Sequence, residues 1–246
     1  MTIPPPVTED TLLGGRVRLR QPVQGGLRAG LDAVLLAAAL PARPGQRVLE
    51  AGCGSGAAML CLAARVPGLA LLAVERDPAM AALAAENATL NHAEAEVITG
   101  DVADLPLARR LGPYDHAMAN PPYWPGGTAP PAPGRASATH EQGATLADWA
   151  AFLAAGLRHG GTLALVLPAA RFDQGAAALR AASCGGTLLL PLWPRAGVAA
   201  KRVLLLARKG GRGPAILAPG LVLHAADGSY TAAAQAALRD AAALTA

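Results

Sequence analysis

Aromatic residues, charged residues and cysteines are all scarce in this 246-residue sequence. Aromatics make up 3% and charged residues 15%, whereas hydrophobic residues make up 52%. A core of this size must therefore be built largely from Ala, Leu and Val. The three cysteines, Cys53, Cys61 and Cys184, form no CxxC pair, which argues against a disulfide framework and against a zinc site. We therefore expect no metal.

The sequence also lacks segments that direct proteins into or across membranes. Residues 1–6 include no basic stretch followed by an apolar run, unlike a signal peptide. No uncharged apolar run with suitable flanks reaches the ~18–20 residues that a membrane span needs. We therefore expect a cytoplasmic protein with no membrane partner.

Acidic residues are absent from one long stretch, 174–226, although the whole chain carries a net charge of only +4. The basic residues in this stretch are Arg180, Arg195, Lys201, Arg202, Arg208, Lys209 and Arg212. A second basic cluster, Arg16, Arg18, Arg20 and Arg28, lies near the N-terminus. Clustered positive charge on a nearly neutral protein favours a polyanionic partner, with a solvated basic surface as the alternative.

Short apolar runs alternate with Ala-rich stretches of helical length. They predict strands at 47–50, 70–75, 96–99, 116–119, 162–167, 187–192 and 202–207, and helices at 57–66, 78–91, 146–157 and 172–182. We expect Gly160 and Gly161 to end the third of these helices. The alternation predicts an α/β fold of Rossmann-like type, with a seven-stranded, mostly parallel sheet. Because no long helix separates the last two strands, we expect them to form an antiparallel pair at one end.

Two segments lie outside this predicted core. Residues 1–45 form an N-terminal extension, with a hairpin around Gly14 and Gly15 and a short helix at 32–40. Residues 46–208 form the core and residues 209–246 a C-terminal tail, which we interpret as one domain in total. The loop at 124–144 is rich in Gly and Pro, and loops of that length inside a domain are often functional.

The sequence VLEAGCGSG at 48–56 leaves a predicted strand and enters a predicted helix. Gly52, Gly54 and Gly56 allow the backbone to turn sharply and to approach a ligand without interference from a Cβ atom. The spacing is GxGxG and not the GxGxxG of dinucleotide-binding loops, which argues against NAD.

Three acids stand at or just after the carboxyl ends of predicted strands, where ligands bind in open α/β sheets. Glu50 can orient the amino end of a methionine moiety. Glu75 can bind the hydroxyls of a ribose, and Asp101 can accept a hydrogen bond from an adenine amine. Together with the glycines, these acids predict a nucleoside-containing cofactor.

The motif Asn120-Pro121-Pro122-Tyr123 follows the fourth predicted strand, at the same edge of the sheet. An exocyclic amine is a poor nucleophile, because its lone pair is delocalised into the ring. If Asn120 Oδ1 and the Pro121 carbonyl hold its two hydrogens, the nitrogen moves towards sp³ geometry and its lone pair points at a methyl donor. The prolines stiffen the turn, and Tyr123 offers an aromatic face to an extruded base.

With these motifs the chain resembles the bacterial tRNA adenine-N6 methyltransferases that act on valine tRNA. Further residues carry the resemblance: Gln21, GLDAVLLA at 30–37, VLP at 166–168, KRVLLL at 201–206, LVLH at 221–224 and GSYT at 228–231. The resemblance implies a single-domain class I methyltransferase that uses S-adenosylmethionine, releases S-adenosylhomocysteine and acts on RNA, most closely a tRNA. It also implies that Asp32 lies near the methionine end of the cofactor.

Candidate contacts to RNA are Arg28, Trp124, Lys201 and Arg202. Trp124 can stack on a neighbouring base or pack under its loop, and Arg202 can contact phosphate or stiffen the entry of the last strand. His140 and Glu141 can line the pocket mouth or stand in a solvated loop. The loop after Tyr123 departs from the family pattern, which leaves the identity of the RNA open.

Four other functions share parts of this pattern. Glutamine methyltransferases that modify release factors share Asn-Pro-Pro-Tyr, but they carry a helical domain before the glycine loop, where this chain has only residues 1–47. DNA adenine methyltransferases usually add a recognition domain. Ribosomal RNA is a further candidate substrate. A basic RNA-binding module on a degenerate fold would have a broken motif, whereas both motifs are intact here. The oligomeric state is not readable from the sequence.

Overall fold

The structure is a computed structural model that describes residues 6–23, 29–122 and 144–244. Its strands are β1 (Val7–Leu12), β2 (Val17–Pro22), β3 (Arg47–Ala51), β4 (Ala70–Glu75), β5 (Ala95–Thr99), β6 (Tyr114–Ala119), β7 (Leu157–Pro168), β8 (Cys184–Trp193), β9 (Arg202–Lys209), β10 (Ile216–Leu217) and β11 (Leu221–Val222). Its helices are α1 (Leu31–Ala39), α2 (Ala57–Arg65), α3 (Pro78–Leu90), α4 (Leu105–Leu111), α6 (Leu146–Gly156), α7 (Phe172–Ala181) and α8 (Ala232–Arg239), with single 3₁₀ turns η1 (Leu13–Gly15) and η2 (Ala169–Arg171).

One large sheet has the strand order β10-β8-β9-β7-β6-β3-β4-β5, with β11 also paired to β8. Strands β3 to β7 run parallel to their neighbours in this group, and β9 runs antiparallel to both β7 and β8. The seven predicted strands and the antiparallel pair are confirmed. β10 and β11, two residues each, and helices α4 and α8 were not predicted from the sequence.

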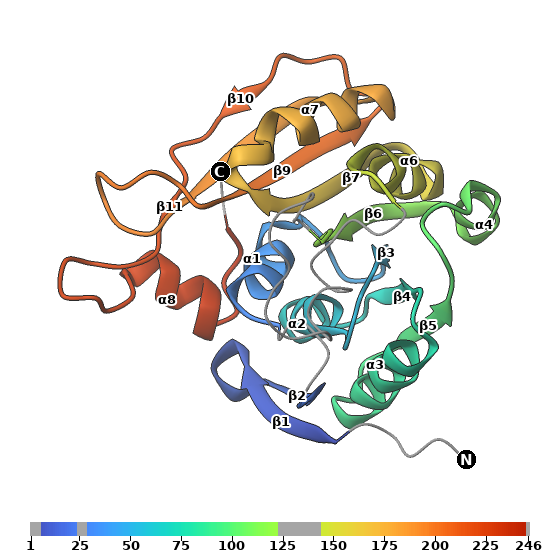
Figure 1. The fold of residues 1–246 in the computed structure, drawn as a ribbon, viewed down its shortest axis with the longest axis horizontal. Coiled ribbons are helices and arrows are strands. Elements are labelled where there is room, and N and C mark those ends of the chain that lie inside the picture. Colours follow the sequence, from blue (N-terminus) through green and yellow to red (C-terminus); the bar gives the residue numbers. More distant parts are fainter. Residues whose placement is uncertain (1–5, 24–28, 123–143, 245–246) are drawn as a thin grey trace.

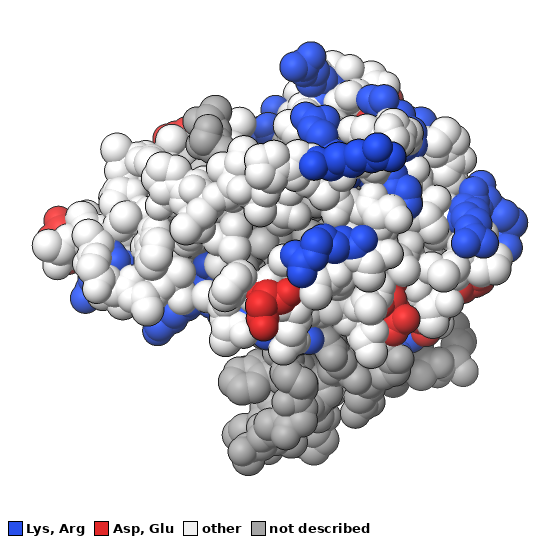
Figure 2. Space-filling view, turned by 90° about the horizontal axis from the view of Figure 1, so that it is seen from above, with Lys and Arg blue, Asp and Glu red and all other residues white. Residues whose placement is uncertain are grey.

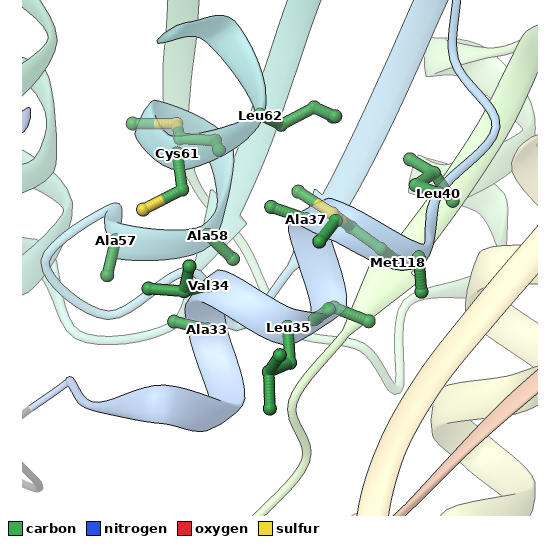
Figure 3. Close-up of a cluster of buried hydrophobic side chains, with 14 of the residues drawn as sticks. Ala33, Val34, Leu35, Ala37, Leu40, Ala57, Ala58, Cys61, Leu62 and Met118 are labelled. Carbon is green, nitrogen blue, oxygen red and sulfur yellow. The ribbon is translucent and has the colours of Figure 1, made fainter. Parts of the chain in front are cut away.

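Helices cover both faces of the sheet, which is why its central strands are apolar on both sides. Successive residues of β3 point to opposite faces: Val48 packs with α1 and α2, whereas Leu49 packs with α4 and α6. Figure 1 shows these two helical layers on either side of the sheet. Figure 3 shows the first layer, where small and branched side chains of α1 and α2 meet Met118 of β6.

The helix predicted at 146–157 ends at Gly156, and β7 begins directly at Leu157. The expectation that Gly160 and Gly161 end this helix was therefore wrong. Both glycines lie inside β7, where the pairing with β6 shifts register between Tyr114 and His116. Gly160 has a φ of +76°, and a Cβ on Gly161 would stand 2.8 Å from the Asp115 carbonyl oxygen. These glycines form a β-bulge rather than a helix stop.

The predicted N-terminal hairpin is confirmed as β1 and β2, and it is attached to the core by Asn87 of α3 and by Asn91, which caps the C-terminus of α3. Asn91 Oδ1 accepts from Arg18 N at 2.9 Å, and its Nδ2 donates to Arg18 O at 2.7 Å. Asn87 makes the same pair of bonds with Arg20, both at 2.9 Å, and its Nδ2 also donates to Ser55 O at 2.9 Å. The two amides thus pair with the β2 backbone as a neighbouring strand would.

The N-terminal and C-terminal segments lie side by side. Helix α8 packs on α1 and η1, and Leu244 N donates to Ala38 O at 2.8 Å. Arg16 Nη1 donates to the carbonyl oxygen of Arg239 at the end of α8. Both segments therefore belong to the packed body of the molecule. No helix within the described ranges is long and apolar enough to cross a membrane.

Replacing Asn87 by Ala should destabilise the fold by about 3 kcal/mol. Removal of this fully buried side chain leaves the polar backbone groups of Arg20 and Ser55 without hydrogen-bond partners. The matched variant Asn91→Ala removes similar bonds at a more exposed position and should cost about 1 kcal/mol. Urea denaturation of both variants measures the difference. Equal losses would show that burial does not set the strength of this attachment.

Candidate functional site

The carboxyl ends of three neighbouring parallel strands meet at one edge of the sheet. Ala51 at the end of β3 lies opposite Val74 of β4 on one side and Ala119 of β6 on the other. The glycine loop, Glu75 and Asn120 begin within a residue or two of these positions. The register of three strands therefore brings the two predicted motifs together.

The glycine loop folds back onto β4. Gly52 N donates to the Val74 carbonyl oxygen at 2.7 Å, and Gly54 N donates to Glu75 Oε2 at 2.9 Å. Gly52, Gly54 and Gly56 have φ values of +63°, +56° and +88°, so each adopts the left-handed conformation that glycine tolerates best. The three predicted glycines thus share one conformational requirement.

The space around these glycines separates their roles. A Cβ on Gly54 would meet nothing within 4 Å among the described residues, so this backbone borders open space that a ligand can enter. A Cβ on Gly52 would stand 2.3 Å from Cη2 of Trp149, so the indole of α6 fills the space beneath the loop. Gly54 therefore faces the open side and Gly52 the packed side.

Glu75 and Asp101 hold the turns that follow β4 and β5. Glu75 Oε2 accepts from Gly54 N, and its Oε1 accepts from Asp77 N at 3.0 Å. Asp101 Oδ1 accepts from Ala103 N at 2.9 Å. Each carboxylate oxygen can accept more than one hydrogen bond, so these bonds leave capacity for ribose hydroxyls and an adenine amine.

Glu50 is 3% exposed, and its Oε2 has no hydrogen-bond partner within the part of the chain that the structure describes. Burial raises the pKa of the Glu50 carboxyl to about 8; the neighbouring Glu75 charge adds to the rise and a backbone hydrogen bond from Met59 opposes it. A buried carboxyl with a spare acceptor stabilises a cation placed beside it. The sequence predicted Glu50 as the partner of an amino group, and this environment suits that role.

Asn120 follows β6 directly, and its Oδ1 is also buried with no partner among the residues described. Pro121 is buried and Pro122 is half-buried. An unpaired buried amide oxygen is costly, and a ligand that donates a hydrogen bond there recovers the cost. Among the described residues, the oxygen that the sequence predicts as an acceptor therefore stays unpaired.

Asp32 and Arg202 form an ion pair of 3.0 Å between Arg202 Nε and Asp32 Oδ2. Asp32 lies in the first turn of α1, and Arg202 begins β9 opposite Pro168, the last residue of β7. Arg202 Nη1 also donates to the Lys201 carbonyl oxygen. The structure thus joins a residue predicted near the cofactor to one predicted to contact substrate, at the carboxyl edge of the sheet.

The acid-free stretch at 174–226 does not form one basic surface, which corrects the view of it as a single cluster. β9 is antiparallel, so Arg202 at its start lies at the carboxyl edge, whereas Arg208 and Lys209 lie opposite Thr162 and Cys184 near the starts of β7 and β8. Seven residues of strand separate Arg202 from Lys209 by about 23 Å. Figure 2, which views the molecule from the side of α7 and β10, shows Lys and Arg gathered towards one end of that face.

The described arginines of the N-terminal basic cluster already have partners within the protein. Arg18 Nε and Arg20 Nε lie 2.8 and 3.6 Å from the Glu9 carboxylate, and Arg16 binds backbone carbonyls of Leu13 and Arg239. Of the other predicted residues, Arg28, Tyr123, Trp124, His140 and Glu141 lie outside the described residues. No cluster of His, Cys, Asp and Glu suited to a metal ion occurs in the described ranges.

Sequence reasoning missed Trp149 and Asn87. Trp149 is 8% exposed, and its Nε1 has no hydrogen-bond partner among the described residues. Asn87 links the loop residue Ser55 to the N-terminal hairpin. A helical Trp or Asn carries no sequence signal of such a role, because its partner is distant in the chain.

Comparison with known proteins shows that the sequence is similar to methyltransferases. Residues 28–134 match the family model described as the methyltransferase small domain. The chain is 34% identical over 209 residues to the tRNA1(Val) (adenine(37)-N6)-methyltransferase of Aeromonas hydrophila subsp. hydrophila, and the match covers 83% of this chain and 86% of the relative.

Solved structures show the same fold. A predicted O-methyltransferase, Atu636 from Agrobacterium tumefaciens, superposes with a TM-score of 0.72 at 25% identity, covering 87% of this chain and 98% of the other. The Thermus thermophilus 16S rRNA N2 G1207 methyltransferase, solved with AdoMet and guanosine, superposes with a TM-score of 0.58 at 21% identity. The match covers 83% of this chain and 50% of that enzyme.

The raised pKa of Glu50 predicts a pH-dependent stability of the cofactor-free protein. The unfolded chain loses the Glu50 proton near pH 4.5, whereas the folded chain keeps it until about pH 8. Rising pH therefore favours unfolding in this window, by at most about 1.4 kcal/mol per pH unit. Relative to Glu50→Gln, the wild-type protein should lose stability between pH 5 and pH 8, as measured by denaturation at several pH values. Parallel curves for the two proteins would contradict the shift.

Proposed function

This chain belongs to the tRNA1(Val) (adenine(37)-N6)-methyltransferase family, and we propose that it transfers a methyl group from S-adenosylmethionine to N6 of an anticodon-loop adenine in a tRNA. The observation that carries the proposal is the buried, unpartnered Asn120 Oδ1 at the carboxyl end of β6, next to the glycine loop. This oxygen has no hydrogen-bond partner among the residues that the structure describes. A ligand that donates a hydrogen bond, such as an exocyclic amine, satisfies this acceptor.

The described residues fit S-adenosylmethionine. Gly54 borders open space, Glu50 offers a buried carboxyl oxygen to an ammonium group, and Glu75 and Asp101 hold the turns beyond the next two strands. When bound, S-adenosylmethionine supplies an electrophilic methyl group on a sulfonium. We assign Glu50 to its amino end, Glu75 to its ribose and Asp101 to its adenine, with Gly52, Gly54 and Gly56 forming the loop beside it and Asp32 near its methionine end.

Asn120 and Pro121 bind the amine that receives the methyl group. Asn120 Oδ1 accepts one N6 hydrogen and the Pro121 carbonyl accepts the other, which directs the nitrogen lone pair out of the base plane. The buried turn of Pro121 and the half-buried Pro122 hold both acceptors in fixed orientation before the base arrives. The N6 nitrogen would form a bond to the methyl carbon while the carbon–sulfur bond of the sulfonium breaks, which leaves S-adenosylhomocysteine, and one N6 proton would then pass to solvent. Tyr123 is assigned to stack on the base, and no strong base is required.

The RNA completes the proposal. An adenine in an anticodon loop is unpaired, so it can be splayed out at little cost. We assign Lys201, Arg202, Arg28 and Trp124 to the RNA, and we interpret residues 1–246 as one methyltransferase domain with an extension at 1–45, a core at 46–208 and a tail at 209–246. Because tRNA is its proposed substrate, we expect the enzyme in the cytoplasm.

Asn120→Ala should reduce turnover by about 10²–10³-fold, because it removes one of two acceptors that align the amine. Its affinity for S-adenosylhomocysteine should stay within about two-fold of the wild-type value, since the cofactor residues are untouched. Single-turnover methylation and calorimetric titration measure the two quantities. A variant that keeps its turnover would show that Asn120 is not an acceptor.

The substrate is tested by mass-spectrometric mapping of N6-methyladenine in RNA from a strain that lacks the gene. We expect loss of the mark next to the anticodon of one tRNA, restored by the wild-type gene and not by Asn120→Ala. Loss from ribosomal RNA instead would favour the ribosomal alternative. If RNA is unchanged and a release-factor glutamine loses its methyl group, the acceptor is the protein amide.

A further inference from the structure

A turn in the C-terminal segment holds an aromatic pair near two cationic side chains. The rings of His224 and Tyr230 stack with centroids 5.0 Å apart and planes at 28°. The guanidinium of Arg239, from α8, lies 5.9 Å from the Tyr230 ring centroid. Arg195 lies at the same turn, since a Cβ on Gly228 would be 3.9 Å from its Nη2. Arg195 and Arg239 are both exposed.

Backbone bonds hold this turn in place. His224 and Tyr230 form an antiparallel bridge, and Ala225 N donates to Ser229 O at 2.9 Å. His224 Nδ1 lies 3.2 Å from the Pro194 carbonyl oxygen, which fixes the imidazole. Asp227, the acid of the turn, accepts from Ser229 N and Oγ at 2.9 and 2.7 Å. The stack is therefore formed before any ligand binds.

Sheet pairing places the turn at the edge that carries the candidate site. β11 pairs with the end of β8, Val222 opposite Trp193, and His224 N donates to the Pro194 carbonyl oxygen. Asn120 follows the end of β6, and the order β6-β7-β9-β8-β11 separates it from the turn that follows β11 by four strand spacings, or about 19 Å. Arg202 starts β9 between them.

We propose that this turn, residues 224–230, together with Arg195 and Arg239, is a second RNA-contact surface that binds an unpaired nucleotide flanking the target adenine. The proposal rests on the proposed function. Single-stranded RNA is bound where cations meet its phosphates and planar groups stack on its bases. A base can stack on the exposed guanidinium of Arg239, which Tyr230 supports, while Arg195 meets a phosphate. The separation of about 19 Å suits another nucleotide of the loop rather than the target itself.

The basic residues at the opposite edge supply a matched control. Arg180, in the last turn of α7, and Arg212, beyond the end of β9, are both exposed, and they lie near the start of β8. Arg180→Glu/Arg212→Glu changes the net charge as much as Arg195→Glu/Arg239→Glu. Non-specific attraction to RNA predicts equal effects, whereas a surface at the carboxyl edge predicts unequal ones.

The experiment measures binding of a short RNA hairpin with the target adenine in its loop, in the presence of S-adenosylhomocysteine and over a range of salt. Arg195→Glu/Arg239→Glu should weaken binding about ten-fold or more and lower the salt slope by about one, because the phosphate contact of Arg195 is lost. Arg180→Glu/Arg212→Glu should change the affinity less than about three-fold. Equal weakening by both variants, or none by the first, overturns the proposal.

Two further variants test the stack itself. Tyr230→Phe keeps an aromatic face and should bind the hairpin like the wild-type protein, whereas Tyr230→Leu should bind it about five-fold or more weakly. Unchanged affinity for S-adenosylhomocysteine shows that both variants are folded. Equal hairpin affinity for Phe and Leu overturns the role of the stack.

Methylation of the hairpin separates this proposal from the proposed function. If the wild-type protein methylates the loop adenine and Arg195→Glu/Arg239→Glu does so at unchanged KM, only the second surface is overturned. If the wild-type protein methylates no RNA, the proposed function fails and the second surface fails with it.

Discussion

The site depends on the parallel pairing of β3 with β4 and with β6. This register places the ends of the three strands side by side, so the turns that follow them face one another across the same edge. Glu75 then reaches back to Gly54, which holds the glycine loop open on its ligand side. Asn120 arrives beside that loop although 64 residues separate it from Gly56 in the numbering. A shift of one residue in either pairing would turn these groups to the wrong face.

Two buried oxygen atoms without hydrogen-bond partners in the described ranges lie at the candidate site and lower the stability of the fold. Glu50 Oε2 and Asn120 Oδ1 have no partner among the described residues, although most buried polar groups in proteins are paired. Leaving such a group unpaired costs about 1–3 kcal/mol. The two lie on β3 and directly after β6, strands that pair with each other, so this part of the cost falls at the positions proposed for the cofactor and the target base. Cofactor and base would restore hydrogen bonds that folding alone does not make.

The reversal of β9 divides the basic residues of the C-terminal half between two edges. Arg195, Lys201 and Arg202 stay with the site, and Arg208, Lys209 and Arg212 go to the far edge. The Arg202–Asp32 ion pair connects β9 to α1, and α8, which belongs to the C-terminal tail, packs on α1. The N-terminal and C-terminal segments therefore pack at the sheet edge that carries the candidate site and do not form separate bodies.

The sequence by itself determined the strand and helix alternation, the glycine loop and the Asn-Pro-Pro-Tyr motif, because these signals are local: apolar periodicity, glycine spacing and paired prolines. It also predicted roles for Glu50 and Asn120, since Glu50 lies within the segment 48–56 and Asn120 begins the Asn-Pro-Pro-Tyr motif. Only the tertiary structure decided that Trp149 fills the space under Gly52, that Asn87 attaches the hairpin, that Gly160 and Gly161 bulge within β7, and that the basic stretch splits in two. These features depend on which strands pair and in which direction, and such pairing joins residues that are distant in the chain.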